Sequence, residues 1–89
     1  MKWNLVYDER VVKDIQGIGT KEIFRIKEKI EWLCDNCEEI PHQSLEGKRF
    51  NHKYKLRVGD YRVIYSLNPK QRILTIEHIG HHSSVYKLK

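Results

Sequence analysis

The segment 53–65 alternates cationic with apolar side chains around a Gly-Asp pair, and this pattern constrains the fold more than any other. Gly59 and Asp60 suit the two-residue turn of a β-hairpin. A turn there places Arg57 opposite Arg62 on the neighbouring strand. One face of the predicted hairpin is apolar or aromatic, with Tyr54, Leu56, Val58, Tyr61, Val63 and Tyr65. The other face carries four cations, Lys53, Lys55, Arg57 and Arg62.

This cationic face costs stability, because like charges placed directly opposite each other destabilise a pair of strands. A cluster of this kind therefore indicates a function in binding an anion, and the phosphate backbone of a nucleic acid is the best candidate. A row of cations is also found on strands where it only protects an edge or faces solvent. The residues alone leave both interpretations open.

The charge of the chain is polarised along the sequence. The formal net charge is +5, but residues 1–46 contain seven Lys and Arg against ten Asp and Glu. Residues 47–72 contain eight Lys and Arg, and Asp60 is their single acidic residue. A surface divided in this way steers anionic partners toward one face.

Hydrophobic periodicity predicts the elements that precede the hairpin. Residues 2–7 alternate as a strand does. Asp8 is the expected N-cap of a short helix that reaches about residue 16. Thr20 is the expected N-cap of a longer helix to about residue 36, whose apolar positions recur at helical spacing.

A last strand is predicted over residues 72–79, with Leu74, Ile76 and His78 on its core side. The expected class is α+β, in the order β-α-α-β-β-β. An antiparallel-rich sheet of about four strands has the N-terminal helical hairpin packed on one face. Eighty-nine residues are enough for one small domain, so we expect residues 1–89 to form a single domain.

Several classes of protein are disfavoured by composition. Cys34 and Cys37 form one Cys-x-x-Cys pair, whereas a closed zinc site needs four ligands. We expect two reduced, apolar cysteines, no metal and no small-molecule cofactor. No apolar run approaches the roughly 20 residues that cross a bilayer. The N-terminus lacks the apolar centre of a signal peptide, so we expect a cytoplasmic protein without a membrane partner.

Two motifs carry a family resemblance. They are Tyr-Lys-Leu-Arg-Val-Gly-Asp-Tyr-Arg-Val-Ile-Tyr at 54–65 and Gly-His-His-x-x-Val-Tyr at 80–86. With these motifs the chain resembles, over almost its whole length, the RelE/ParE superfamily of bacterial and archaeal toxins, and in particular its RelE-like ribonuclease branch. The resemblance implies a toxin of a type II toxin-antitoxin system. Such a toxin cleaves mRNA in the ribosomal A site and is held inactive by a cognate antitoxin.

The resemblance also implies the site residues. The family's basic positions correspond to Lys53, Lys55 and Arg62, and its tail positions to His82 and Tyr86. We expect Lys55, Arg62, His82 and Tyr86 to be catalytic and Lys53 to bind RNA. Arg57 joins Lys53 as an RNA-binding residue because it lies on the same cationic face of the hairpin. His82 stands where the family usually has arginine. Tyr86 is expected to stack on an unpaired base or to share in proton transfer.

Metal-free cleavage of RNA can use the adjacent 2′-hydroxyl as nucleophile, and the predicted residues suit its steps. The guanidinium fork of Arg62 matches phosphate oxygens and stabilises charge on phosphorus. Lys55 is the favoured base over Lys53, because neighbouring cations disfavour the protonated form of a lysine. His82 is the candidate general acid for the departing 5′-oxygen.

Two other functions stay open on the sequence. One is a ParE-like toxin that binds DNA gyrase without chemistry of its own. The other is a catalytically degenerate module that binds nucleic acid or antitoxin. Of the other histidines, we expect His42, His52 and His81 at the surface and His78 as a hydrogen-bonded structural residue.

Overall fold

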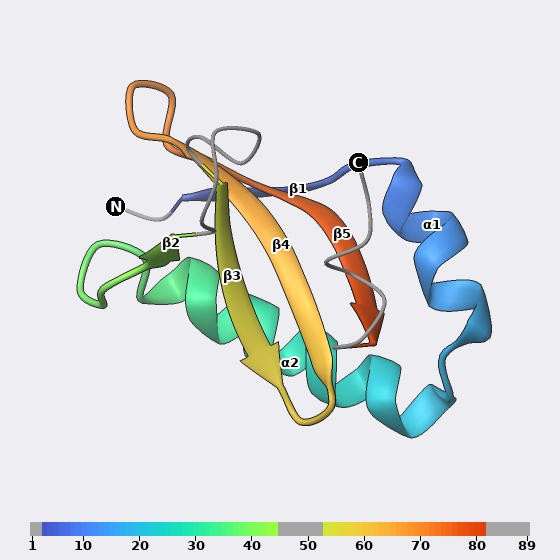
Figure 1. Cartoon of the computed structure of the whole chain (residues 1–89). Helices are drawn as coiled ribbons and strands as arrows, with labels where there is room; N and C mark the ends of the chain where they lie inside the picture. Colours follow the sequence, from blue (N-terminus) through green and yellow to red (C-terminus); the bar gives the residue numbers. More distant parts are fainter. Residues whose placement is uncertain (1–2, 45–52, 82–89) are drawn as a thin grey trace.

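Five strands form the sheet, in the order β1-β5-β4-β3-β2 (Figure 1). The computed structural model describes residues 3–44 and 53–81. The strands are β1 (Asn4–Tyr7), β2 (Gln43–Ser44), β3 (Lys53–Val58), β4 (Tyr61–Asn68) and β5 (Ile73–His81). β1 pairs parallel with β5, and the other neighbouring strands pair antiparallel. The α+β class is confirmed, and the additional strand is β2, which pairs only two residues with β3.

The predicted hairpin of β3 and β4 is confirmed in its register. Arg57 pairs with Arg62, Leu56 with Val63 and Tyr54 with Tyr65. Gly59 adopts a φ of 60°, in the left-handed region that only glycine enters at little cost. The turn therefore depends on Gly59, one of the two residues from which it was predicted.

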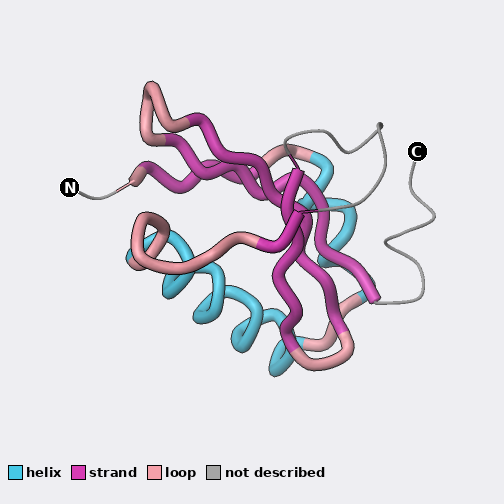
Figure 2. Tube along the Cα trace, turned by 60° about the vertical axis from the view of Figure 1, so that its left-hand side comes forward, coloured by secondary structure: helices cyan, strands magenta, loops and turns pink. Residues whose placement is uncertain are grey.

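Three helical segments connect β1 to the rest of the sheet. They are α1 (Arg10–Asp14), the 3-10 turn η1 (Ile15–Gly17) and α2 (Thr20–Asp35). Figure 2 shows α2 running along one side of the strands. Thr20 is the first residue of α2 and Gly19 its N-cap, so the predicted cap was one residue late. Neither described helix is long and apolar enough to span a membrane.

α1 lies at the edge of the sheet, beside the second half of β5. β1 leaves β5 at Asp8, whose backbone N–H donates to the carbonyl of Ile76 at 2.8 Å. Asp8 also accepts a hydrogen bond from the N–H of Arg10 at 2.9 Å, so it supports the first turn although Glu9 is the N-cap. Further along, the carboxylate of Asp14 accepts from the N–H of Ile79 at 3.0 Å. A helix side chain thus replaces the missing strand partner.

The core fills the space between α2 and the inner face of the sheet. Leu33 of α2, Val63 of β4 and both Leu74 and Ile76 of β5 are fully buried. Around them lie Val11, Ile26, Ile30, Cys34, Cys37, Tyr65 and Ile79. Tyr54 and Tyr61 pack against this core as partly buried residues.

The pairing of β4 with β5 shifts by one residue at a β-bulge. Tyr65 faces Ile76, but the preceding residue of β4, Ile64, faces His78. Glu77 is therefore the extra residue of β5. Beyond the bulge Ile79 takes the core position, and the prediction that His78 shares the core side is wrong. A strict period of two does not continue through a bulge.

Candidate functional site

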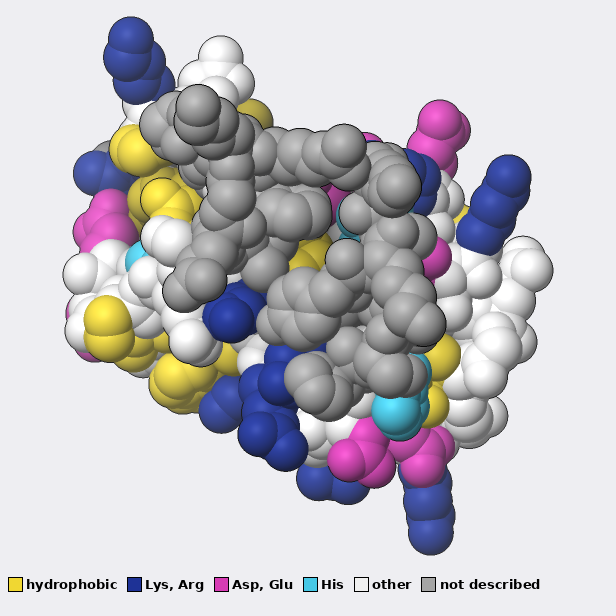
Figure 3. All heavy atoms as spheres, in the orientation of Figure 1, with side chains coloured by type: hydrophobic (Ala, Val, Ile, Leu, Met, Phe, Trp, Pro, Cys, Tyr) yellow, Lys and Arg dark blue, Asp and Glu magenta, His cyan; other side chains and the backbone are white. Residues whose placement is uncertain are grey.

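The four predicted cations project from one face of the sheet, opposite the face that α2 covers. Along β3, lysine or arginine alternates with residues that pack on the core, and Arg62 on β4 precedes the buried Val63. Figure 3 looks at this face and shows Lys and Arg side chains gathered over β3 and β4. We call the side of β3, β4 and β5 that lies away from α2 the outer face.

Three cross-strand rows organise the outer face. They are Lys53–Ser66–Thr75, Lys55–Ile64–His78 and Arg57–Arg62–Gly80. Successive rows on one face are two residues apart, or about 7 Å. Each row contains one cation from β3, and the last row adds Arg62 from β4. Positive charge therefore extends along the strand rather than gathering at one point. Such a track suits an extended phosphate backbone.

The four cations differ in their surroundings. Arg57 is exposed, and its Nε donates to the carbonyl of Gly59 at 3.2 Å, which folds the guanidinium toward the hairpin turn. Lys55 and Arg62 are half-buried on neighbouring strands. Lys53 forms an ion pair with the carboxylate of Glu77. The sequence indicated the shared face but not these differences.

A second charged cluster adjoins the cations where α1 meets β5, and the sequence reasoning missed it. Arg10 binds the carboxylate of Asp8 at 3.0 Å and lies 3.8 Å from that of Glu77. His78 Nε2 lies 3.2 Å from an Arg10 nitrogen, and its Nδ1 lies 3.4 Å from Asp14. His78 is thus hydrogen-bonded, as predicted. Glu77 was visible as one acidic residue in an otherwise largely apolar strand.

Arg10 also fixes the charge state of its nearest carboxylate. Its guanidinium, with a hydrogen bond from its backbone N–H, lowers the pKa of Asp8 to about 2. The same pair raises the pKa of Arg10. Both groups are therefore charged at neutral pH.

Two predicted catalytic residues, His82 and Tyr86, lie outside the described residues, as does His52. His81 ends β5 and is exposed, as expected, with its ring 5.8 Å from that of Tyr61. The described part of the site therefore comprises the cationic track and the charged cluster beside it.

His42 differs from its predicted surface position, because it is half-buried between β4 and the segment that follows α2. Its Nδ1 lies 2.7 Å from the hydroxyl of Tyr65, and its Nε2 lies 2.7 Å from the carbonyl of Cys37. Since a carbonyl only accepts, Nε2 is the donor to the Cys37 carbonyl. These contacts give His42 a structural role.

The two cysteines are buried and unbridged, as expected. Burial raises the pKa of the Cys37 thiol to about 11, so it is protonated at neutral pH. In residues 3–44 and 53–81, no three His, Cys, Asp or Glu side chains are grouped as metal ligands.

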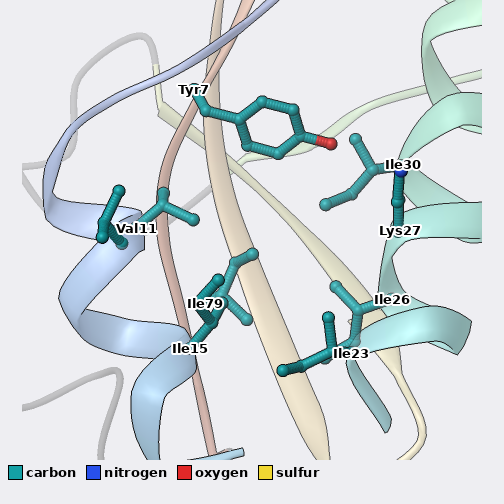
Figure 4. A pocket seen from close by; sticks show the side chains of 9 residues that line it. Tyr7, Val11, Ile15, Ile23, Ile26, Lys27, Ile30 and Ile79 are labelled. Atoms are coloured by element: carbon teal, nitrogen blue, oxygen red, sulfur yellow. The ribbon is translucent and has the colours of Figure 1, made fainter. Parts of the chain in front are cut away.

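A different kind of surface lies on the opposite side of the molecule. A groove of about 260 Å³ separates α1 from α2 above β5. Apart from Tyr7 and Lys27, its lining residues are aliphatic, among them Val11, Ile23 and Ile79 (Figure 4). Burial raises the pKa of Tyr7, which is neutral at physiological pH. This lining suits binding of apolar side chains.

Comparison with known proteins matches a family model and a named relative over most of the chain. The family model described as "ParE toxin of type II toxin-antitoxin system, parDE" matches residues 5–86. A protein of Methanocaldococcus jannaschii named as the toxin RelE1 is 32% identical over 90 residues, covering 98% of each chain.

Solved structures share the fold. A chain of the archaeal RelE-RelB complex from Pyrococcus horikoshii OT3 superposes with a TM-score of 0.72 at 29% identity, over 92% of this chain and 97% of that one. A chain of the toxin-antitoxin complex RelBE2 from Mycobacterium tuberculosis gives a TM-score of 0.78 over 91% and 99%. Its identity of 13% supports the fold alone.

Proposed function

The chain belongs to the RelE/ParE superfamily of type II toxin-antitoxin toxins, and from this we propose that it is a ribosome-dependent endoribonuclease, an mRNA interferase. Residues 1–89 act as a single toxin domain in the cytoplasm, on mRNA in the ribosomal A site. The observation that supports this proposal is the outer face, where Lys53, Lys55, Arg57 and Arg62 share one side of β3 and β4. A protein that only occupied a partner's apolar surface would not need this track.

In the proposed reaction the 2′-oxygen attacks the adjacent phosphorus and the bond from phosphorus to the 5′-oxygen breaks. The products are a 2′,3′-cyclic phosphate and a free 5′-hydroxyl. Lys55 takes the proton of the 2′-hydroxyl, and His82 gives one to the departing 5′-oxygen. Arg62 stabilises the charge that develops on the phosphoryl oxygens. No metal or small-molecule cofactor takes part.

The remaining residues hold the substrate in this mechanism. Lys53 and Arg57 contact phosphates on either side of the cleaved linkage, as expected from their places in the outer rows of the track. Tyr86 stacks on an exposed base. Positioning of this kind accounts for much of the catalysis in phosphoryl transfer.

A cognate antitoxin is the partner that the family membership supports, and structural neighbours are complexes of this kind. We place an antitoxin helix in the groove between α1 and α2. Its aliphatic walls suit the apolar stripe of an amphipathic helix. An acidic residue at the edge of that stripe complements Lys27.

A ParE-like toxin that binds gyrase is the second candidate, because the matching family model is described as a ParE toxin. That function needs a protein-binding surface and no phosphate chemistry. The cationic track is the observation that favours the nuclease over it.

Cleavage is tested by adding the purified protein to ribosomes programmed with mRNA and mapping the new 5′ ends. We expect cuts that leave 5′-hydroxyls, loss of these cuts in Arg62→Ala, and unchanged cutting in Lys70→Ala. Lys70 is an exposed cation of the β4–β5 turn and provides the matched control.

Intact mRNA together with inhibition of gyrase supercoiling would identify the gyrase-binding toxin instead. Intact mRNA together with binding to ribosomes would identify the catalytically degenerate module. Either result would contradict the nuclease proposal, provided that circular dichroism shows the protein to be folded.

A further inference from the structure

Glu77 is a buried carboxylate on the face of the sheet that carries the cations. The residue is 8% exposed, although acidic residues are almost never buried without a partner. It is the extra residue of the β-bulge, between Ile76 on the core side and His78 on the outer face. Bulges are concentrated beside active sites, where they redirect a side chain.

Two cations meet at one oxygen of this carboxylate. Oε1 of Glu77 forms an ion pair with the ammonium of Lys53 and lies 3.8 Å from the guanidinium of Arg10. Lys53 belongs to β3 and Arg10 to α1, so Glu77 connects two elements that are distant in the sequence.

The geometry determines where the ammonium of Lys53 lies. β4 separates β3 from β5 in the sheet, so the side chain of Lys53 must cross β4 to reach Glu77. Two strand spacings amount to roughly 9.5 Å. The ammonium is therefore held over the middle of the outer face rather than at its β3 edge. Without Glu77 a flexible four-carbon chain would have many other positions.

Stability gives no sufficient reason for a carboxylate at this place. Replacing a buried ion pair by apolar residues of similar size is often neutral or stabilising. Ile64 of β4 lies on the same outer face and is 5% exposed, which shows that a branched apolar residue suits this face. What an apolar residue would not provide is a fixed position for the Lys53 ammonium.

We propose that Glu77 is a positioning residue of the nuclease site, which acts through Lys53 and is itself held by Arg10. This inference rests on the proposed function. It assigns Lys53 to phosphate binding as a fixed ammonium, which leaves Lys55 as the base. A carboxylate near the substrate backbone also repels it, so Glu77 orders the site at some cost in RNA affinity.

The test is the Glu77→Gln variant, measured for single-turnover cleavage of ribosome-bound mRNA at a series of toxin concentrations. We expect the maximal rate to fall about tenfold, because a misplaced binding group costs rate. We expect the half-saturating concentration to fall as well, because the repulsive charge is removed. A purely structural role would not give tighter binding with slower cleavage. Glu39→Gln, at an exposed site, is the matched control and should change neither quantity.

A second experiment tests whether Glu77 acts through Lys53. In a Lys53→Met background, Glu77→Gln should have no further effect on the cleavage rate. An equal tenfold loss in that background, or a wild-type rate in folded Glu77→Gln, would overturn the inference. If Glu77→Gln does not fold, Lys53→Arg replaces it. That variant keeps the charge but moves the donors, so a wild-type rate would likewise overturn the inference.

Cleavage by the wild-type protein distinguishes failure of this inference from failure of the proposed function. If it cleaves mRNA and the variants match it, only the role of Glu77 is lost. If it leaves mRNA intact, the proposed function is lost and the role of Glu77 with it.

Discussion

The two faces of β4 carry neighbouring residues into very different surroundings. Val63 and Tyr65 point to the inner face and are at most 1% exposed. Arg62 and Ser66 point to the outer face and are half-buried. The inner face is held by packing against α2, whereas the outer face gathers charges that packing alone would not favour. Inner residues should therefore control stability, and outer residues should control activity.

The largest expected effect is a loss of stability in Leu74→Ala, on the inner face. The side chain is fully buried, so its truncation should lower the free energy of unfolding by about 2–5 kcal/mol. Denaturation in urea measures this loss. Lys70→Ala, at an exposed turn, should stay within about 0.5 kcal/mol of the wild type. Equal effects of the two variants would mean that the inner face is not the core.

The next largest expected effect is that of Arg62→Lys, on the outer face, on the rate of mRNA cleavage. Lysine keeps the charge but loses the fork that binds two phosphate oxygens, so cleavage should slow by about 10- to 100-fold. Arg57→Lys is the matched change in the same cross-strand pair. Because Arg57 is exposed and folded toward the turn, its loss should be smaller. A larger loss at Arg57 would move the centre of the site toward the hairpin turn.

Val12→Asp tests whether antitoxin binding in the groove is separate from mRNA cleavage at the outer face. Val12 lines the groove and is 59% exposed, so the substitution should leave folding and cleavage unchanged. A charge placed among aliphatic residues should raise the Kd for the antitoxin by about tenfold, measured by calorimetry. Phe24→Asp, an exposed apolar residue of α2 outside the groove lining, should leave the Kd unchanged. Equal losses would place the antitoxin elsewhere.

The smallest of the expected effects is that of Asp8→Asn on the free energy of unfolding. Asp8 lies at the edge where the two faces of the sheet meet. The carboxylate of Asp8 has its pKa lowered to about 2 by Arg10. Its contribution to stability is therefore complete above pH 4, the range of an unperturbed aspartate, and is lost as the pH falls toward 2. Unfolding curves of Asp8→Asn and wild type should differ slightly at pH 7 and converge near pH 2. A difference that persists at pH 2 would show that charge is not the cause.

The sequence predicted the half of the site that depends on local pattern. The alternation around Gly59 and Asp60 was sufficient to predict the register of the hairpin and the shared face of its cations. Family resemblance then assigned roles that composition and spacing do not contain. The α+β class followed from the order of periodic segments.

What the sequence did not show depends on contacts between distant segments. The bulge at Glu77 breaks the period of two, so His78 was assigned to the wrong side. His42 is half-buried through its contact with Tyr65, 23 residues away. The pairing of β2 covers two residues, which is too short to leave a periodic signal.

The central claim is tested most directly by two adjacent residues of β4, through Arg62→Ala and Val63→Ala. For each variant we would measure the free energy of unfolding and the rate of mRNA cleavage per folded molecule. Val63→Ala should lose about 2 kcal/mol of stability, from two buried methyl groups and the cavity they leave, and keep its cleavage rate. Arg62→Ala should keep its stability and lose cleavage by about 100-fold or more. Wild-type cleavage by folded Arg62→Ala would contradict the account.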